Sequence, residues 1–140
     1  NVDVNSDSIK AVDGTLLIKV LDFNGKMSFN KELNIYVTPL SNAIFFSIPT
    51  DELLKGLNKK ELVLSTVLTM HGLAVSKNLL YFDHPNLLQL QKPDIKTKII
   101  QNTSGFEIEL TTNSLAKRVF LSLPNGDYNF SDNFFDPLPN

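Results

Sequence analysis

The chain has 140 residues, a length that fits one domain with a core large enough to fold without disulfides or bound metals. Its hydrophobic content of 42% and charged content of 20% are those of a globular protein and exclude wholesale disorder. With 13 basic and 15 acidic residues, the net charge of -2 gives no single-sign field to hold nucleic acid or an anionic membrane. We therefore expect no nucleic acid and no membrane among its partners.

The sequence also limits metal and redox chemistry. It has no cysteine, which excludes disulfides and thiolate metal sites, and its two histidines, His71 and His84, are too few for a histidine cluster. No apolar run approaches the roughly 18 residues that cross a bilayer. Because the chain begins at Asn1 and its opening lacks the apolar core of a signal peptide, we interpret it as a piece of a larger protein.

Short runs with period-two alternation, separated by turn residues, dominate the first third of the chain and indicate antiparallel strands. Residues 1–13 are expected to form only an N-terminal linker or edge segment. The strand-like run 15–23 leads into Asn24-Gly25, a dipeptide that favours a tight hairpin. We expect the returning strand to end at Pro39, which has no N–H for a ladder, and another strand to follow.

A helix is expected in one place only, after the strand over 41–48. Thr50 or Asp51 can cap a helical turn, and Gly56 would end it. Residues 61–69 then resume strand character with apolar side chains on both faces, which predicts a central strand.

The second half of the chain continues the alternating pattern. The strands expected there are 73–82, 95–99, 106–110, 115–123 and 128–135. The leucines of the loop 85–93 are expected to pack against the core. About eight short strands spaced by turns predict an all-β fold, an immunoglobulin-like antiparallel β-sandwich over residues 14–140.

Two acidic side chains, Glu107 and Glu109, share one face of a predicted strand. Glycosidic cleavage needs two carboxyls across a sugar, one of them in a pocket that raises its pKa. The alternation of these glutamates with apolar residues is instead typical of a solvent face. Nucleophile and phosphate-loop motifs are also missing from the sequence, so we predict no catalytic residue.

The segment from Asp127 to Asp132 has oxygen ligands at alternate positions, as in a calcium loop. The sixth position of that loop should be Gly and the twelfth Glu, whereas the chain has Asp132 and Leu138. We favour a structural role, in which Asp and Asn side chains bond to backbone amides at a strand end. No metal and no cofactor is expected.

Three adjacent aromatic pairs stand out, namely Phe45-Phe46, Tyr81-Phe82 and Phe134-Phe135. Neighbours on a strand point to opposite faces, so at most one ring of each pair is expected in the core. The other ring would be shielded by loops, serve a domain interface or form a sugar platform. Because the chain has no Trp, the usual stacking residue for carbohydrate is missing, and the interface is the favoured functional interpretation.

The last ten residues form the most specific pattern in the chain, Ser131-Asp132-Asn133-Phe134-Phe135-Asp136-Pro137-Leu138-Pro139-Asn140. This tail resembles the closing segment of family-two glycoside hydrolases of the β-mannosidase type, which read Phe-Ser-Asp-Asn-(Tyr/Phe)-Phe-Asp-Leu-Leu-Pro-Gly. The run Leu115-Ala116-Lys117 is similar too, and the likeness spans roughly residues 14 to 140. The tail departs from the family at Pro137 and Asn140.

This resemblance implies a non-catalytic, immunoglobulin-like C-terminal domain that braces the other domains of a β-mannosidase-like enzyme. In that family the catalytic glutamates belong to a separate (β/α)₈ barrel, so no catalytic residue carries over. The implied partners are the parent enzyme's other domains, and the implied location is secreted, periplasmic or lysosomal. The alternatives are a carbohydrate-binding β-sandwich module and a structural cell-surface domain, although sugar binding by this domain is not expected.

Four tail residues are the predicted structural motif and the candidates for packing against other domains: Asp132, Asn133, Phe134 and Phe135. A terminal strand would turn one of the two rings inward. The tail is therefore expected to be needed for folding, whereas residues 1–7 are expected to be dispensable.

Overall fold

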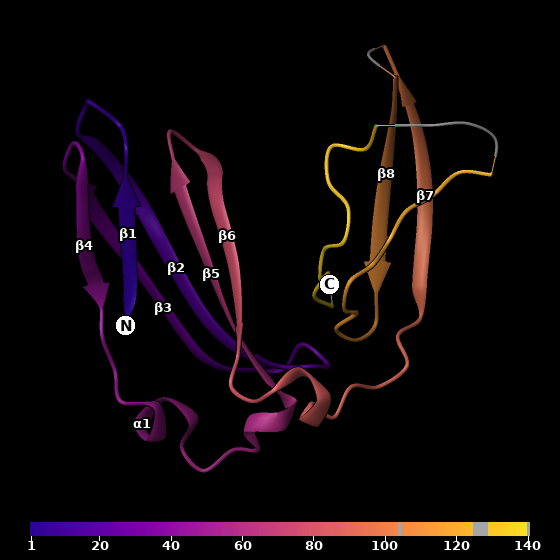
Figure 1. The fold of residues 1–140 in the computed structure, drawn as a ribbon, viewed down its shortest axis with the longest axis horizontal. Coiled ribbons are helices and arrows are strands. Elements are labelled where there is room, and N and C mark those ends of the chain that lie inside the picture. Colours follow the sequence, from indigo (N-terminus) through magenta and orange to yellow (C-terminus); the bar gives the residue numbers. More distant parts are fainter. Residues whose placement is uncertain (104, 125–128, 140) are drawn as a thin grey trace. The chain divides into compact units, whose positions relative to one another are not determined.

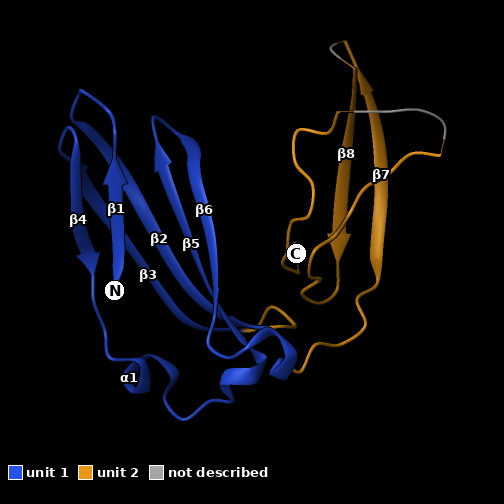
Figure 2. Ribbon diagram, viewed as in Figure 1, with its two compact units in different colours: residues 1–22, 27–88 blue, residues 23–26, 89–140 orange. Residues whose placement is uncertain are grey.

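The structure, a computed structural model, describes residues 1–103, 105–124 and 129–139. Its strands pair antiparallel throughout, which confirms the predicted all-β class (Figure 1). The described chain forms two compact units (Figure 2): unit 1 is Asn1–Asp22 with Met27–Leu88, and unit 2 is Phe23–Lys26 with Gln89–Asn140. The sequence predicted an N-terminal linker or edge segment over residues 1–13 and one domain over residues 14–140.

Unit 1 contains two sheets. Its strands are β1 (Val2–Ser6), β2 (Val12–Asp22), β3 (Met27–Val37), β4 (Ser41–Phe46), β5 (Leu62–Met70) and β6 (Leu73–Tyr81). β1 pairs with β4, and the larger sheet has the order β3-β2-β5-β6, which makes β5 a central strand as predicted. The predicted hairpin joins β2 to β3, with Gly25 at φ 89°.

The two sheets of unit 1 face each other across an apolar core (Figure 1). Val4 of β1 packs in one cluster with buried residues of the larger sheet, namely Leu16, Ile18, Ile35, Val37 and Leu68. A second cluster joins Val20 and Leu62 to two leucines of the helical segment. Unit 1 is therefore a sandwich in which β1 supplies part of the core, which corrects the expectation that residues 1–7 are dispensable.

The predicted helix is present as α1 (Thr50–Leu54), followed by the 3₁₀ turn η1 (Lys59–Glu61). α1 has Pro49 at its N-cap and no side-chain cap, so the expected cap by Thr50 or Asp51 does not form. It ends at Lys55, which is left-handed at φ 49°. Within the described ranges, no helix is long and apolar enough to span a bilayer.

Both Phe45 and Phe46 pack against the first core cluster, which contradicts the expectation of one ring at most. The cause is a register shift between β1 and β4. Val2 pairs with Phe46 and Asp3 with Ile44, which leaves Phe45 as an extra residue on β4. Such a bulge bends its strand and breaks the strict alternation of side chains.

Unit 2 contains the predicted hairpin of β7 (Ile95–Asn102) and β8 (Gly105–Thr112). The strands predicted over 115–123 and 128–135 do not form in the described residues, where Val119 and Phe135 make an isolated bridge. Arg118 and Phe134 have φ of 54° and 60°, which lies outside the strand region. These left-handed residues stop the ladder on both sides of the bridge.

The loop leucines differ from expectation as well. Leu87 belongs to the 3₁₀ turn η2 (Pro85–Leu87), and both Leu87 and Leu90 are exposed rather than packed in the core.

The role of β1 predicts that Val4→Asp destabilises unit 1. Burying a carboxyl without a partner should lower the free energy of unfolding by at least about 2 kcal/mol. Chemical denaturation followed by circular dichroism measures this change. The control is Val75→Asp, since Val75 is a strand valine that is 54% exposed. Equal stability of the two variants would contradict the placement of β1 in the core.

Candidate functional site

The tail and the segment after β8 lie side by side within unit 2. The Val119 N–H donates to the Phe135 carbonyl at 2.9 Å, and the Ala116 N–H donates to the Pro137 carbonyl at 3.2 Å. Leu115 and Ala116 are buried, and the Leu115 N–H donates to the Phe23 carbonyl at 2.7 Å. The two most specific parts of the family resemblance therefore contact each other.

Asn133 continues this pairing with its side chain. Its Oδ1 accepts the Leu121 N–H at 2.7 Å, and its Nδ2 donates to the Leu121 carbonyl at 2.9 Å. Asp132 accepts the N–H of Asn133 at 2.8 Å, and Asn133 Oδ1 accepts the N–H of Phe134 at 3.1 Å. The Asn133 side-chain amide thus takes the place of a strand backbone, because it bonds both the N–H and the carbonyl of Leu121.

Asp136 makes the second side-chain link. Its Oδ1 accepts the Arg118 N–H at 2.6 Å, and its Oδ2 accepts from Lys117 Nζ at 3.1 Å. Both charged side chains of this ion pair are largely buried. Lys117 and Asp136 belong to separate motifs of the sequence, which does not reveal their contact, although both motifs are part of one family pattern.

The tail aromatics lie at different depths. Phe134 is 67% exposed and packs at a tilt against Phe120, which is 57% exposed, with ring centroids 4.9 Å apart. Phe135 is half-buried. The expected inward ring is therefore Phe135, although it reaches only partial burial, and Phe134 is available at the surface. A packing role for these rings against other domains stays a prediction.

Phe135 lines a hollow of about 980 Å³ within unit 2. Its aliphatic and aromatic lining consists of Ile99, Phe106, Ile108, Leu121, Leu123, Phe130 and Phe135. Its polar lining consists of Asn102, Glu107, Asn129, Ser131 and Asp132. Among the described lining residues, the carboxylates belong to Glu107 and Asp132, which are both exposed.

The other sequence candidates take structural positions. Lys98 Nζ lies 3.6 Å from Glu109 Oε2 and both side chains are exposed, as a solvent face requires. Across the described ranges, no three His, Cys, Asp or Glu residues are grouped to hold a metal ion. Asp127, the first residue of the considered calcium loop, lies outside the described residues. His71 occupies the turn between β5 and β6 at φ 52°.

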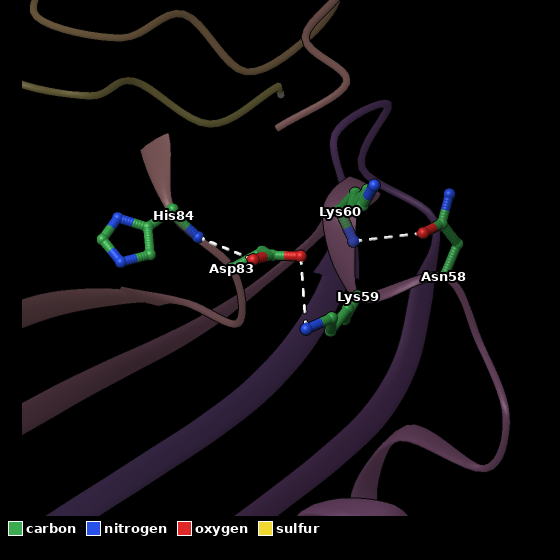
Figure 3. Close-up of polar contacts among 5 residues, drawn as sticks. All are labelled: Asn58, Lys59, Lys60, Asp83 and His84. Carbon is green, nitrogen blue, oxygen red and sulfur yellow. Dashed lines mark hydrogen bonds and ion pairs between the residues drawn. The ribbon is translucent and has the colours of Figure 1, made fainter. Parts of the chain in front are cut away.

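A polar cluster in unit 1 joins the end of β6 to η1 (Figure 3). Asp83 accepts the backbone N–H of His84 at 2.9 Å and pairs with Lys59 Nζ at 3.3 Å. The side chain of Asp83 is 10% exposed, and Asn58 Oδ1 accepts the Lys60 N–H at 3.2 Å. The His84 N–H and then the Lys59 ammonium lower the pKa of Asp83 below its ordinary value of 3.8. This cluster links the end of β6 to η1, and the lowered pKa keeps the Asp83 carboxyl ionised near neutral pH.

Known protein families match the chain in two blocks. The family model described as a mannosidase Ig/CBM-like domain matches residues 1–85, which is more than half of the chain. The chain belongs to this family. A second model, described as an Ig-fold domain, matches residues 90–140, and together they confirm the predicted immunoglobulin-like class. No curated protein matches the chain.

Two solved structures share the fold. A β-D-mannosidase from Dictyoglomus thermophilum superposes with a TM-score of 0.76 at 20% identity, and covers 94% of this chain and 16% of its own. The exo-chitosanase of Amycolatopsis orientalis gives a TM-score of 0.65 at 16% identity, and covers 98% of this chain and 21% of its own. The chain therefore spans about a sixth to a fifth of these proteins.

The geometry of Asn133 predicts that Asn133→Ala destabilises unit 2. The substitution leaves the Leu121 N–H and carbonyl without this partner, at a cost of about 1 to 3 kcal/mol. Asn133→Asp should also destabilise, since it keeps the acceptor but replaces the donor. Denaturant unfolding measures both effects, with the exposed loop residue Asn86→Ala as the control. Wild-type stability of Asn133→Ala would contradict the proposed pairing role.

The lowered pKa of Asp83 predicts a pH-dependent contribution to stability. Because its folded pKa lies below its unfolded pKa, the contribution is present above pH of about 4 and is lost as the pH falls through the folded value. Asp83→Asn should therefore be less stable than wild type at pH 7, and the difference should shrink in acid. Melting temperatures from pH 2 to 7 check this. A difference that stays constant with pH would count against an ionic role.

Proposed function

We propose that the chain is a non-catalytic accessory part of a β-mannosidase-like glycoside hydrolase and braces the enzyme's other domains. The observation that carries the proposal is the match of the mannosidase Ig/CBM-like domain family over residues 1–85. The fold likeness to a β-D-mannosidase supports it, because that protein devotes only 16% of its chain to the shared part. The remaining chain of such an enzyme holds the other domains.

The carboxylates of the chain support a role outside catalysis. Glu107 and Glu109 are neighbours on one strand, and both are exposed. A glycosidase pair lies about 5 to 10 Å apart around a bound sugar, and its acid needs a raised pKa. Glu109 instead pairs with Lys98, and both side chains are exposed.

A carbohydrate-binding module remains the second candidate function. The observation that favours it is the exposed, tilted ring pair Phe120–Phe134, because sugar rings stack on exposed aromatic faces. The two ring planes are tilted by 31° and the chain has no Trp, so the platform offered is small. We therefore rank bracing first.

The proposal predicts that the 140-residue chain neither cleaves glycosides nor binds sugars measurably. Aryl β-mannosides should remain intact, and titration calorimetry with mannobiose should give no saturable heat at millimolar ligand, which means a binding free energy weaker than about -4 kcal/mol. The full-length gene product is the control and should cleave the mannoside. A micromolar isotherm that Phe134→Ala abolishes would support the binding module, and a gene product without a catalytic domain would overturn the bracing role.

A further inference from the structure

Unit 2 includes four residues from the first third of the chain. They are Phe23–Lys26, the tip of the hairpin whose strands β2 and β3 belong to unit 1 (Figure 2). The rest of unit 2 begins at Gln89, and the Ig-fold family model that matches there covers residues 90–140. The family match therefore leaves out a segment that belongs to the same compact unit.

The hairpin tip supplies a hydrogen-bond partner to the buried backbone of unit 2. Phe23 is 2% exposed, and its carbonyl accepts the N–H of Leu115, which is 1% exposed, at 2.7 Å. A buried backbone N–H that loses its partner destabilises the fold, because water cannot replace that partner. Leu115 therefore depends on the tip for its backbone hydrogen bond.

The tail reaches the same hairpin tip. A Cβ atom added to Gly25 would lie 2.9 Å from Cγ of Pro139 and 3.5 Å from its Cβ, so the proline ring packs directly on the turn. Two residues earlier in the tail, the Pro137 carbonyl accepts the Ala116 N–H at 3.2 Å. The adjacent residues Leu115 and Ala116 are thus bonded to the tip and to the tail, respectively.

This contact distinguishes Gly25 from two other turn glycines. Gly25, Gly56 and Gly72 have φ of 89°, 77° and 78°, a conformation that side chains disfavour. Apart from chain neighbours, no atom of the described structure lies within 4 Å of a Cβ added to Gly56 or Gly72. Of these three glycines, only Gly25 combines a left-handed turn with a lack of room for a side chain.

We propose that the tail is a strap that closes over the β2–β3 hairpin tip, and that this tip is an integral part of unit 2. Residues 89–139 then hold a stable structure only while residues 23–26 are in place. The region of the second family match is therefore not a separately folding module. The inference goes beyond the bracing role and holds whether or not a parent enzyme is present.

Hydrogen exchange in the 140-residue chain tests the strap. The reporters are the amides of Leu115, Ala116 and Val119, which donate to the tip and to the tail. Gly25→Ala should speed their exchange by about tenfold or more, because the added methyl group overlaps the Pro139 ring. Gly72→Ala is the matched control, since it adds the same group at a positive φ in open space. Equal effects of the two variants on the reporters would overturn the strap.

A change in the tail separates this contact from strain in the turn. Pro139→Ala removes the ring atom nearest Gly25 and alters no residue of the hairpin. Alone it should speed exchange of the reporter amides several-fold. Combined with Gly25→Ala it relieves the overlap, so the double variant should exchange more slowly than Gly25→Ala. Exchange at the rate expected from the two single effects combined would place the strain in the turn itself and overturn the contact.

Phe23→Ala tests whether the tip is part of unit 2. It should speed exchange of the paired amides of β7 and β8 by at least about 100-fold. Met27→Ala, at a side chain that is 50% exposed where β3 begins, is the control and should leave them unchanged. Wild-type protection of β7 and β8 in Phe23→Ala would overturn the dependence. Should Phe23→Ala fail to fold, Pro139→Ala decides, since unchanged exchange of the Leu115 amide in that variant would overturn the strap.

Discussion

Backbone N–H and C=O groups that leave water need hydrogen-bond partners, and the two units meet this requirement in different ways. Unit 1 uses ladders, since β2 pairs over ten positions with β3 and nine with β5. The described part of unit 2 has one hairpin, and beyond it a few backbone bonds and the side chains of Asn133 and Asp136 link the chain segments. Asn133 and Asp136 bond the backbone of Leu121 and Arg118, so the order of the last third of the chain depends on a few polar contacts.

This difference extends to the cores. Unit 1 buries complete side chains such as Ile18 and Val20 between its layers, so its stability derives mainly from apolar burial. In unit 2 Leu115 and Ala116 are buried, while Phe106 and Phe134 remain largely exposed. A unit that keeps large rings at its surface gains stability when another surface covers them. The physical basis of the bracing proposal is therefore in unit 2, although the family match that identifies the chain covers unit 1.

The sequence predicted those strands whose alternation or length is undisturbed. β7 and β8 alternate cleanly, and the Asn24-Gly25 turn determines the pairing of β2 with β3. The period-two alternation gave wrong predictions where one residue departs from the strand conformation. The extra residue Phe45 shifts the register of β4, and the left-handed Phe134 lies within the predicted strand over 128–135, which does not form in the described residues. Such departures depend on tertiary partners, which a single sequence does not reveal.

Three positions of the tail have a distinct physical role in the structure. Asn133 must be both donor and acceptor towards Leu121, which among side chains of its length only an amide provides. Asp136 must accept both a backbone N–H and an ammonium. Pro137, where the family has Leu, contributes its carbonyl to the Ala116 N–H and needs no N–H of its own for that bond. The departure at Pro137 is therefore compatible with the pairing, and a proline also restricts the unfolded chain at this position.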